Sequence, residues 1–165
     1  MRMTSSSKPL ESLAKEDYEL LAEFRYTLRK FLGFSEANAI SHGVTAQQYQ
    51  AMLAIEGFPG RNWVTVGELA EQLRTTHHSA VGLVDRMEVL KLVRRVKATD
   101  DRRRVQVYLT AKGVGILEQL YRVHRNELKM VGPKLITLLQ KASVELPESG
   151  TGFASPACAM PEVED

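Results

Sequence analysis

A cationic segment between two strand-like runs constrains this chain more than any other feature. The runs, Val93–Lys97 and Val105–Leu109, are rich in β-branched residues, and the polar segment between them contains no proline or glycine. This order predicts a β-hairpin with a charged tip. From Lys91 to Arg104, seven of the fourteen residues are Lys or Arg. Such a tip is typical of a surface that binds a polyanion, and the alternative is a solvated surface loop.

Two short helices are predicted directly before this hairpin. Thr65 and Glu68 have the Thr-x-x-Glu spacing of a capping box, which starts the first helix. Thr75 or Thr76 can cap the second helix, over residues 77–90. Its apolar residues form one stripe at helical spacing, and its opposite face is polar. Two short helices and a tight turn indicate a helix-turn-helix for a DNA major groove, and the hairpin makes it a winged helix.

The flanking segments have the periodicity of long amphipathic helices. Four are predicted: Asp17–Phe34, Ala46–Glu56, Lys112–Met130 and Pro133–Lys141. Gly132-Pro133 is expected to separate the last two, because proline breaks helix hydrogen bonding. The apolar stripes of the outer helices either close a monomeric core or form a dimerisation layer, and composition does not decide between these alternatives.

Charge is distributed unevenly along the chain. The net charge of +2 is low for a protein that binds DNA. The segment from Arg61 to Lys112 has eleven bases against six acids, a net charge of +5, whereas Ala142–Asp165 has five acids and no base. The acidic end therefore offsets the positive charge of the basic segment in the net charge of the chain. This asymmetry favours nucleic-acid binding.

The sequence contains no indication of catalysis or of a metal site. It has no glycine-rich phosphate loop and no nucleophile motif, so we expect no enzyme and no cofactor. Cys158 is the only cysteine, which excludes an internal disulfide. His77 and His78 are adjacent, and adjacent side chains on a helix point about 100° apart, so they rarely share one ion. No apolar run reaches the roughly 18 residues of a membrane span, and we expect a cytoplasmic protein.

The helix-turn-helix and hairpin together resemble the DNA-binding core of MarR-type (multiple antibiotic resistance) transcriptional regulators. The resemblance is strong over residues 65–113 and extends more loosely over residues 17–142. It is carried by five short motifs: Leu-Ala-x-x-Leu at Leu69–Leu73, Leu-Val-Asp-Arg-Met at Leu83–Met87, Leu-Val-x-Arg at Leu92–Arg95, the wing signature Asp101-Arg102-Arg103, and Leu-Thr-x-x-Gly at Leu109–Gly113. The chain departs from many relatives at Gly82, where they carry a larger or basic side chain.

The resemblance implies a mainly α fold with a small β-hairpin wing, in which terminal helices form a homodimer. It implies a sequence-specific regulator, a repressor on a pseudo-palindromic operator in double-stranded DNA, released by a small aromatic or lipophilic ligand. The expected organisation is a flexible arm (1–16), a single domain (17–143) and a disordered acidic tail (144–165), the domain comprising the winged helix (62–113) and dimerisation helices (17–37 and 112–143). The alternatives are a regulator without an effector, and a protein-interaction module that uses the basic hairpin on an acidic partner.

Three groups of candidate site residues follow. The recognition helix is expected to contact DNA through Thr76, His77, His78, Ser79 and Arg86. The wing is expected to contact DNA through Lys97, Arg102, Arg103 and Arg104, with Arg103 matching the family's minor-groove arginine. Asp101 would repel phosphates, so we expect it to pair with an arginine and shape the wing. An effector pocket is expected near Phe31, His42, Tyr49 and Trp63, and the alternative is that these side chains are packed core.

Overall fold

The computed structural model describes residues 14–97 and 105–144 of the chain. Expectations for the wing tip, for residues 1–13 of the N-terminal arm and for residues 145–165 of the acidic tail therefore concern residues outside this part. The elements along the chain are α1 (Lys15–Ser41), α2 (Ala46–Glu56), β1 (Trp63–Thr65), α3 (Val66–Gln72), α4 (His77–Val89), β2 (Val93–Lys97), β3 (Val105–Leu109) and α5 (Ala111–Val144). Helices dominate and the sheet is small, as the sequence predicts. Within the described ranges, no helix combines the length and apolarity that crossing a bilayer requires.

The small sheet is antiparallel, with the order β1-β3-β2. The predicted hairpin is confirmed, and its register runs from Val93 opposite Leu109 to Lys97 opposite Val105. The third strand, β1, was not expected from the sequence, since it has only three residues. Its central residue, Val64, is fully buried and lies opposite Val107, so β1 fastens the start of the helix-turn-helix to the hairpin.

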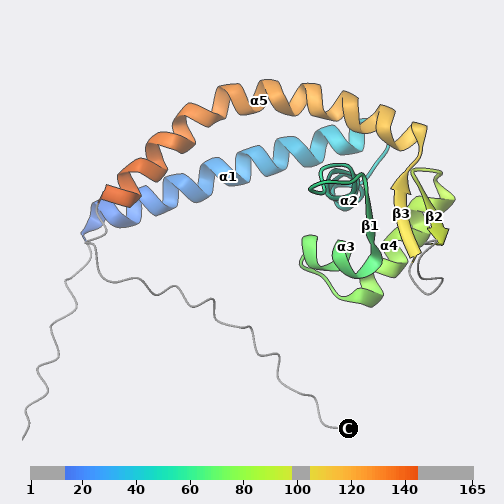
Figure 1. The fold of residues 1–165 in the computed structure, drawn as a ribbon. Helices are drawn as coiled ribbons and strands as arrows, with labels where there is room; N and C mark the ends of the chain where they lie inside the picture. Colours follow the sequence, from blue (N-terminus) through green and yellow to red (C-terminus); the bar gives the residue numbers. More distant parts are fainter. Residues whose placement is uncertain (1–13, 98–104, 145–165) are drawn as a thin grey trace, which may run out of the picture.

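The main hydrophobic core lies where α2, the helix-turn-helix, the sheet and the first half of α5 meet (Figure 1). The predicted start of α2 is confirmed, because Thr45 Oγ1 accepts a hydrogen bond from the Gln48 N–H at 3.2 Å. One face of α4 is buried in the core, and its other face is left to the solvent. The largest fully buried side chains of the core include Met52, Ile55, Leu69, Leu83, Met87, Leu92 and Leu120.

Helices α1 and α5 form a long antiparallel pair that extends well beyond the winged helix (Figure 1). Near the core, His124 Nε2 lies 2.7 Å from Ser35 Oγ, and further out Lys134 pairs with Glu23 at 2.7 Å. Little of α1 is buried: of its 27 residues only Thr27 and Ala39 are. Large apolar side chains of the pair remain exposed, among them Tyr18, Leu21, Leu32, Leu128, Ile136 and Leu139.

The predicted break at Gly132-Pro133 is wrong, because α5 continues through Pro133 to Val144. Proline has no N–H to donate to the carbonyl one turn earlier, but packing on α1 holds the helix together on both sides. Leu138 is buried beyond the proline, and Lys134 is fixed by its ion pair. The result is one curved helix in place of two (Figure 1). Both α1 and α5 are longer than the expected dimerisation helices, residues 17–37 and 112–143.

Candidate nucleic-acid interface

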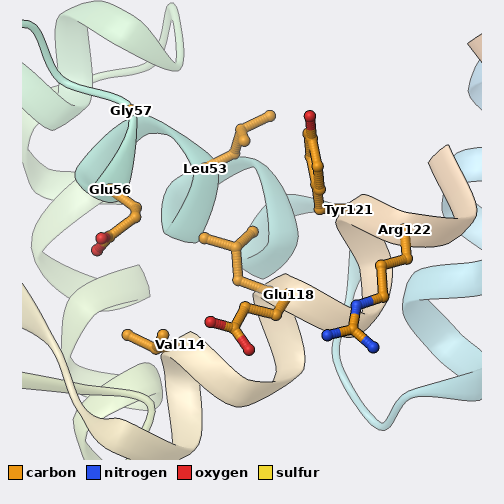
Figure 2. A pocket seen from close by; sticks show the side chains of 8 residues that line it. Leu53, Glu56, Gly57, Val114, Glu118, Tyr121 and Arg122 are labelled. Atoms are coloured by element: carbon orange, nitrogen blue, oxygen red, sulfur yellow. The ribbon is translucent and has the colours of Figure 1, made fainter. Parts of the chain in front are cut away.

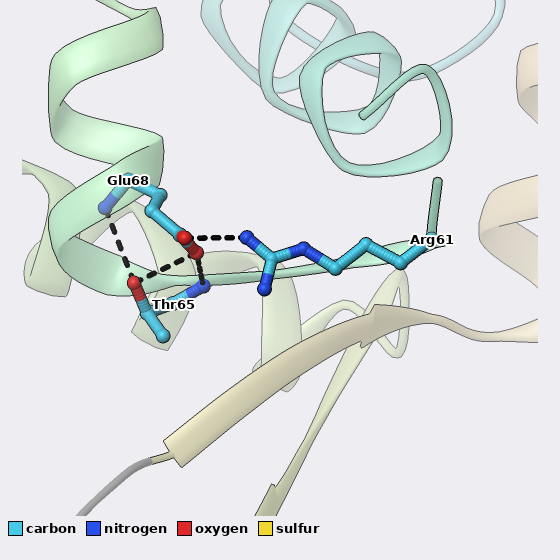
Figure 3. A network of polar contacts seen from close by, with 3 residues as sticks. All are labelled: Arg61, Thr65 and Glu68. Atoms are coloured by element: carbon cyan, nitrogen blue, oxygen red, sulfur yellow. Dashed lines mark hydrogen bonds and ion pairs between the residues drawn. The ribbon is translucent and has the colours of Figure 1, made fainter. Parts of the chain in front are cut away.

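The first helix of the helix-turn-helix, α3, begins at the predicted capping box (Figure 3). Glu68 N–H donates to Thr65 Oγ1 at 3.3 Å, and Thr65 N–H donates to Glu68 Oε2 at 2.8 Å. Arg61 also pairs with Glu68, and its guanidinium lies 3.9 Å from the ring centre of Trp63. Burial alone would raise the pKa of Glu68, but the hydrogen bonds from Thr65 and Arg61 outweigh it and lower that pKa. These contacts fix how β1 and the residues before it meet α3.

The second helix, α4, begins at His77 and is capped by Thr76, which decides between the two predicted caps. Thr76 Oγ1 accepts a hydrogen bond from Ser79 N–H at 3.1 Å and donates to Ser79 Oγ at 2.8 Å. The start of the helix is exposed, and Arg86 is exposed two turns further along. The predicted recognition residues Thr76, His77, His78, Ser79 and Arg86 are therefore all accessible, although the hydroxyl of Thr76 is already engaged as the cap.

Arg95 connects α4 to the hairpin, although the sequence suggested only another cation of the wing. Its guanidinium lies 2.6 Å from Asp85 Oδ1 and 2.6 Å from Glu88 Oε2. Burial alone would lower the pKa of Arg95, but the hydrogen bonds that it donates to both carboxylates raise it. Arg95 therefore neutralises both acids of α4 and links this helix to β2. A sequence signal existed, since both acids precede a strand arginine within ten residues.

The described part of the wing has an exposed cation at the end of β2, Lys97. Arg94 lies over the ring of Tyr108 at 4.7 Å from its centre. The other predicted wing residues, Asp101, Arg102, Arg103 and Arg104, lie outside the described residues, and so their roles stay predictions.

The residues of the expected effector pocket fall into separate groups. Tyr49 stacks on His124 with ring centres 4.7 Å apart, and Phe31 meets the same imidazole edge-on at 6.2 Å. Burial raises the pKa of the Tyr49 hydroxyl. His42 lies at the end of α1, with Nδ1 2.8 Å from the carbonyl oxygen of Asn38, and Trp63 packs near Arg61. The structure thus brings Phe31 and Tyr49 together, but places His42 and Trp63 with other partners.

A groove of about 480 Å³ lies elsewhere, between the end of α2 and the first half of α5 (Figure 2). Its apolar lining includes Leu53, Val114 and Tyr121. Glu56 on α2 and Glu118 on α5 provide two carboxylates, with Arg122 at one end (Figure 2). None of the four predicted pocket residues lines this groove. Among the described residues, no group of three or more His, Cys, Asp or Glu side chains could hold a metal ion.

Comparison with known proteins gives one family and one fold. Residues 42–104 match the model of the MarR family. No curated protein matches the chain. Among solved structures, AbsC, a MarR family transcriptional regulator from Streptomyces coelicolor, is 20% identical, with 81% of this chain and 93% of AbsC covered and a TM-score of 0.66. A MarR family protein from Bacillus stearothermophilus is 21% identical, with 81% and 100% covered and a TM-score of 0.65.

A third similar structure contains DNA. A mutant of MepR from S. aureus, bound to an oligodeoxyribonucleotide, is 18% identical, with 80% of this chain and 94% of that chain covered and a TM-score of 0.58. At these identities the structures establish the fold of this chain. Together with the family match, they confirm the predicted fold class and the resemblance to MarR-type regulators.

Proposed function

We propose that this chain, whose residues 42–104 match the MarR family, is a DNA-binding transcriptional regulator that acts as a homodimeric repressor. The observation that carries the proposal is the exposed polar side of α4, held beside the β2–β3 hairpin by Arg95. A helix presented in this way fits a major groove, and a basic wing fits the adjacent minor groove. The excess of bases over acids between Arg61 and Lys112 supplies the attraction to phosphate.

The homodimer is supported by the exposed apolar side chains of the α1–α5 pair. A helix of 27 residues with two buried positions has more apolar surface than one protomer covers. A second copy would bury this surface and place two α4 helices for successive major grooves. The operator would then be pseudo-palindromic, because its half-sites mirror the symmetry of the dimer.

The test is selection of bound sequences from random duplex DNA with the purified full-length chain. We expect one enriched pseudo-palindrome, and affinity for it should fall steeply as salt is raised, because phosphate contacts release counterions. The alternative function, a module whose hairpin docks an acidic protein, predicts no enriched sequence. Expression of a reporter gene behind the selected operator should fall when the chain is present, and a rise would contradict repression.

The wing gives a specific prediction. Arg103→Ala is expected to weaken binding to the selected operator more than Arg102→Ala, because Arg103 matches the minor-groove arginine of the wing signature. The slope of log affinity against log salt should fall by about one unit for a lost phosphate or minor-groove contact. Binding isotherms at several salt concentrations measure both effects. Equal affinities of Arg103→Ala and the wild-type chain would contradict the assignment.

Ligand release is the finer part of the proposal. His124 is 5% exposed, and its ring nitrogens lie 2.7 Å from Leu120 O and from Ser35 Oγ. This packing around Phe31 and Tyr49 favours a core role for the aromatic residues. The groove between α2 and α5 is the better place for an effector, because α2 packs both on α5 and on the winged helix, through α3, β1 and β3. Its two carboxylates outnumber the one cation, Arg122, and so favour a neutral or cationic aromatic compound over a benzoic acid.

We therefore expect aromatic amines to raise the melting temperature and release the operator, and benzoic and phenolic acids to do neither. A tenfold loss of operator affinity requires only about 1.4 kcal/mol of coupling. Leu53→Trp should fill the groove and abolish the response while leaving DNA binding intact, because Leu53 is half exposed at its rim. If no compound acts at millimolar concentration, the regulator without an effector becomes the better description.

A further inference from the structure

The exposed side of α4 has no side chain at its middle, where Gly82 lies. Arg86 follows four residues later, so the two positions are neighbours on the same side of the helix. A Cβ atom built at Gly82 would lie 3.4 Å from Nη1 of Arg86, and no other atom outside the local backbone would come as close. The Arg86 side chain therefore bends back along α4, and its guanidinium covers the backbone at Gly82.

Among the described residues, the neighbours of Arg86 leave its guanidinium available. Asp85, the adjacent acid, is held by Arg95 at 2.6 Å. Ser79, one turn before Gly82, shares a hydrogen bond with Thr76. In the described part of the chain, no carboxylate lies within ion-pair distance of Arg86. A cation in this position, with five N–H donors in a planar fork, is suited to a bidentate contact with a guanine edge.

We propose that Gly82 and Arg86 form one base-reading unit, in which the missing side chain at position 82 sets the place of the Arg86 guanidinium and so determines sequence preference. The inference rests on the proposed DNA-binding function and adds a specificity-determining position to it. Gly82 itself presents no group to a base. It acts by leaving the space in which the guanidinium lies, at the centre of the surface that would face the major groove.

The distance from a Cβ at position 82 to the Arg86 guanidinium distinguishes this role from a requirement for glycine as such. A contact of 3.4 Å is ordinary van der Waals separation, so the single methyl group of alanine fits beside the guanidinium. Atoms beyond Cβ would occupy the space of the guanidinium and displace it. If glycine were needed because the backbone approaches DNA closely, alanine would be harmful as well. Alanine and leucine at this position therefore distinguish the two roles, and both are better helix formers than glycine.

The experiment measures affinity for the duplex that the wild-type full-length chain selects from random DNA. The variants are Gly82→Ala, Gly82→Leu, Arg86→Ala and the double variant Gly82→Leu/Arg86→Ala. Gly82→Ala should bind within about twofold of wild type. Gly82→Leu and Arg86→Ala should each bind on the order of 10- to 100-fold more weakly, and both should lose preference at the same base pair. The double variant should bind no more weakly than Arg86→Ala.

Melting temperatures control for folding, and we expect both Gly82 variants to melt at or above the wild-type temperature. Equal losses for Gly82→Ala and Gly82→Leu would overturn the proposal in favour of a close backbone approach. Losses that add in the double variant would overturn it as well, since the two positions would then act independently. A wild-type chain that selects no sequence would instead refute the proposed function, and the inference with it.

Discussion

Gly113→Ala is expected to lower the free energy of unfolding by about 3 kcal/mol, because a side chain at this position collides with backbone. A Cβ atom at Gly113 would lie 2.3 Å from the carbonyl oxygen of Leu92. That oxygen cannot move aside easily, since it accepts a hydrogen bond from Thr110 N–H at 3.0 Å. Leu92 is also buried in the core, directly before β2. The substitution must therefore push the start of α5 away from the hairpin.

Urea unfolding followed by circular dichroism measures this effect, and Gly115→Ala is the matched control. Gly115 lies two residues further along α5, and a Cβ there would meet nothing within 4 Å. The control should gain about 0.5–1 kcal/mol, because alanine favours the helix over glycine. If Gly113→Ala also gained stability, the close approach between α5 and Leu92 would be disproved. Reduced stability in both variants would point to a cause other than this contact.

The sequence predicts those parts of the fold that depend on local signals. The capping box of Thr65 and Glu68 is confirmed because both of its hydrogen bonds close within four residues. The two hairpin strands are confirmed by their pairing. They were predictable because their composition and the charged segment between them favour a hairpin over other structures. The strand β1 was not predicted, because three residues are too few to show periodicity. Its partners in β3 lie more than forty positions away in the sequence.

Two further features could not be read from local sequence. In the turn after α4, Lys91 has a φ of 59°, a left-handed conformation that glycine usually adopts. Because lysine stands there, the sequence did not indicate this turn. The continuation of α5 through Pro133 depends on packing against α1, which outweighs the lost hydrogen bond. In both cases tertiary contacts stabilise a backbone that the local residues do not favour.

The candidate site shows the same division. Helical periodicity predicts the exposed polar side of α4, because burial of the opposite stripe fixes it. A count of charges does not reveal which basic side chains are available to bind DNA. Arg95, for example, is paired with two acids of α4. The spacing of Gly82 and Arg86 is visible in the sequence, but the direction of the arginine side chain comes from the structure.

The largest effect on function is expected from the double variant Ile136→Glu/Leu139→Glu, which should convert a dimer to a monomer. Both side chains are about half exposed in the protomer, at 57% and 51%, so the substitutions leave the packing of α5 on α1 intact. In a dimer that covers this face, each carboxylate would be buried without a partner, which is strongly unfavourable. A stable interface of this kind should bury over ~2,000 Å². Sedimentation at micromolar concentration should give twice 18.5 kDa for wild type and 18.5 kDa for the variant.

Loss of the dimer should also weaken operator binding on the order of 100-fold or more, because the second half-site is then no longer bound by a linked copy. Val89→Glu is the control for mass, since Val89 is 81% exposed on α4 and lies outside the α1–α5 pair. It should remain dimeric. The melting curve of the double variant should show one cooperative transition, which separates dissociation from unfolding. A wild-type chain of monomeric mass would contradict the homodimer, and a dimeric double variant would place the interface on another face of the protein.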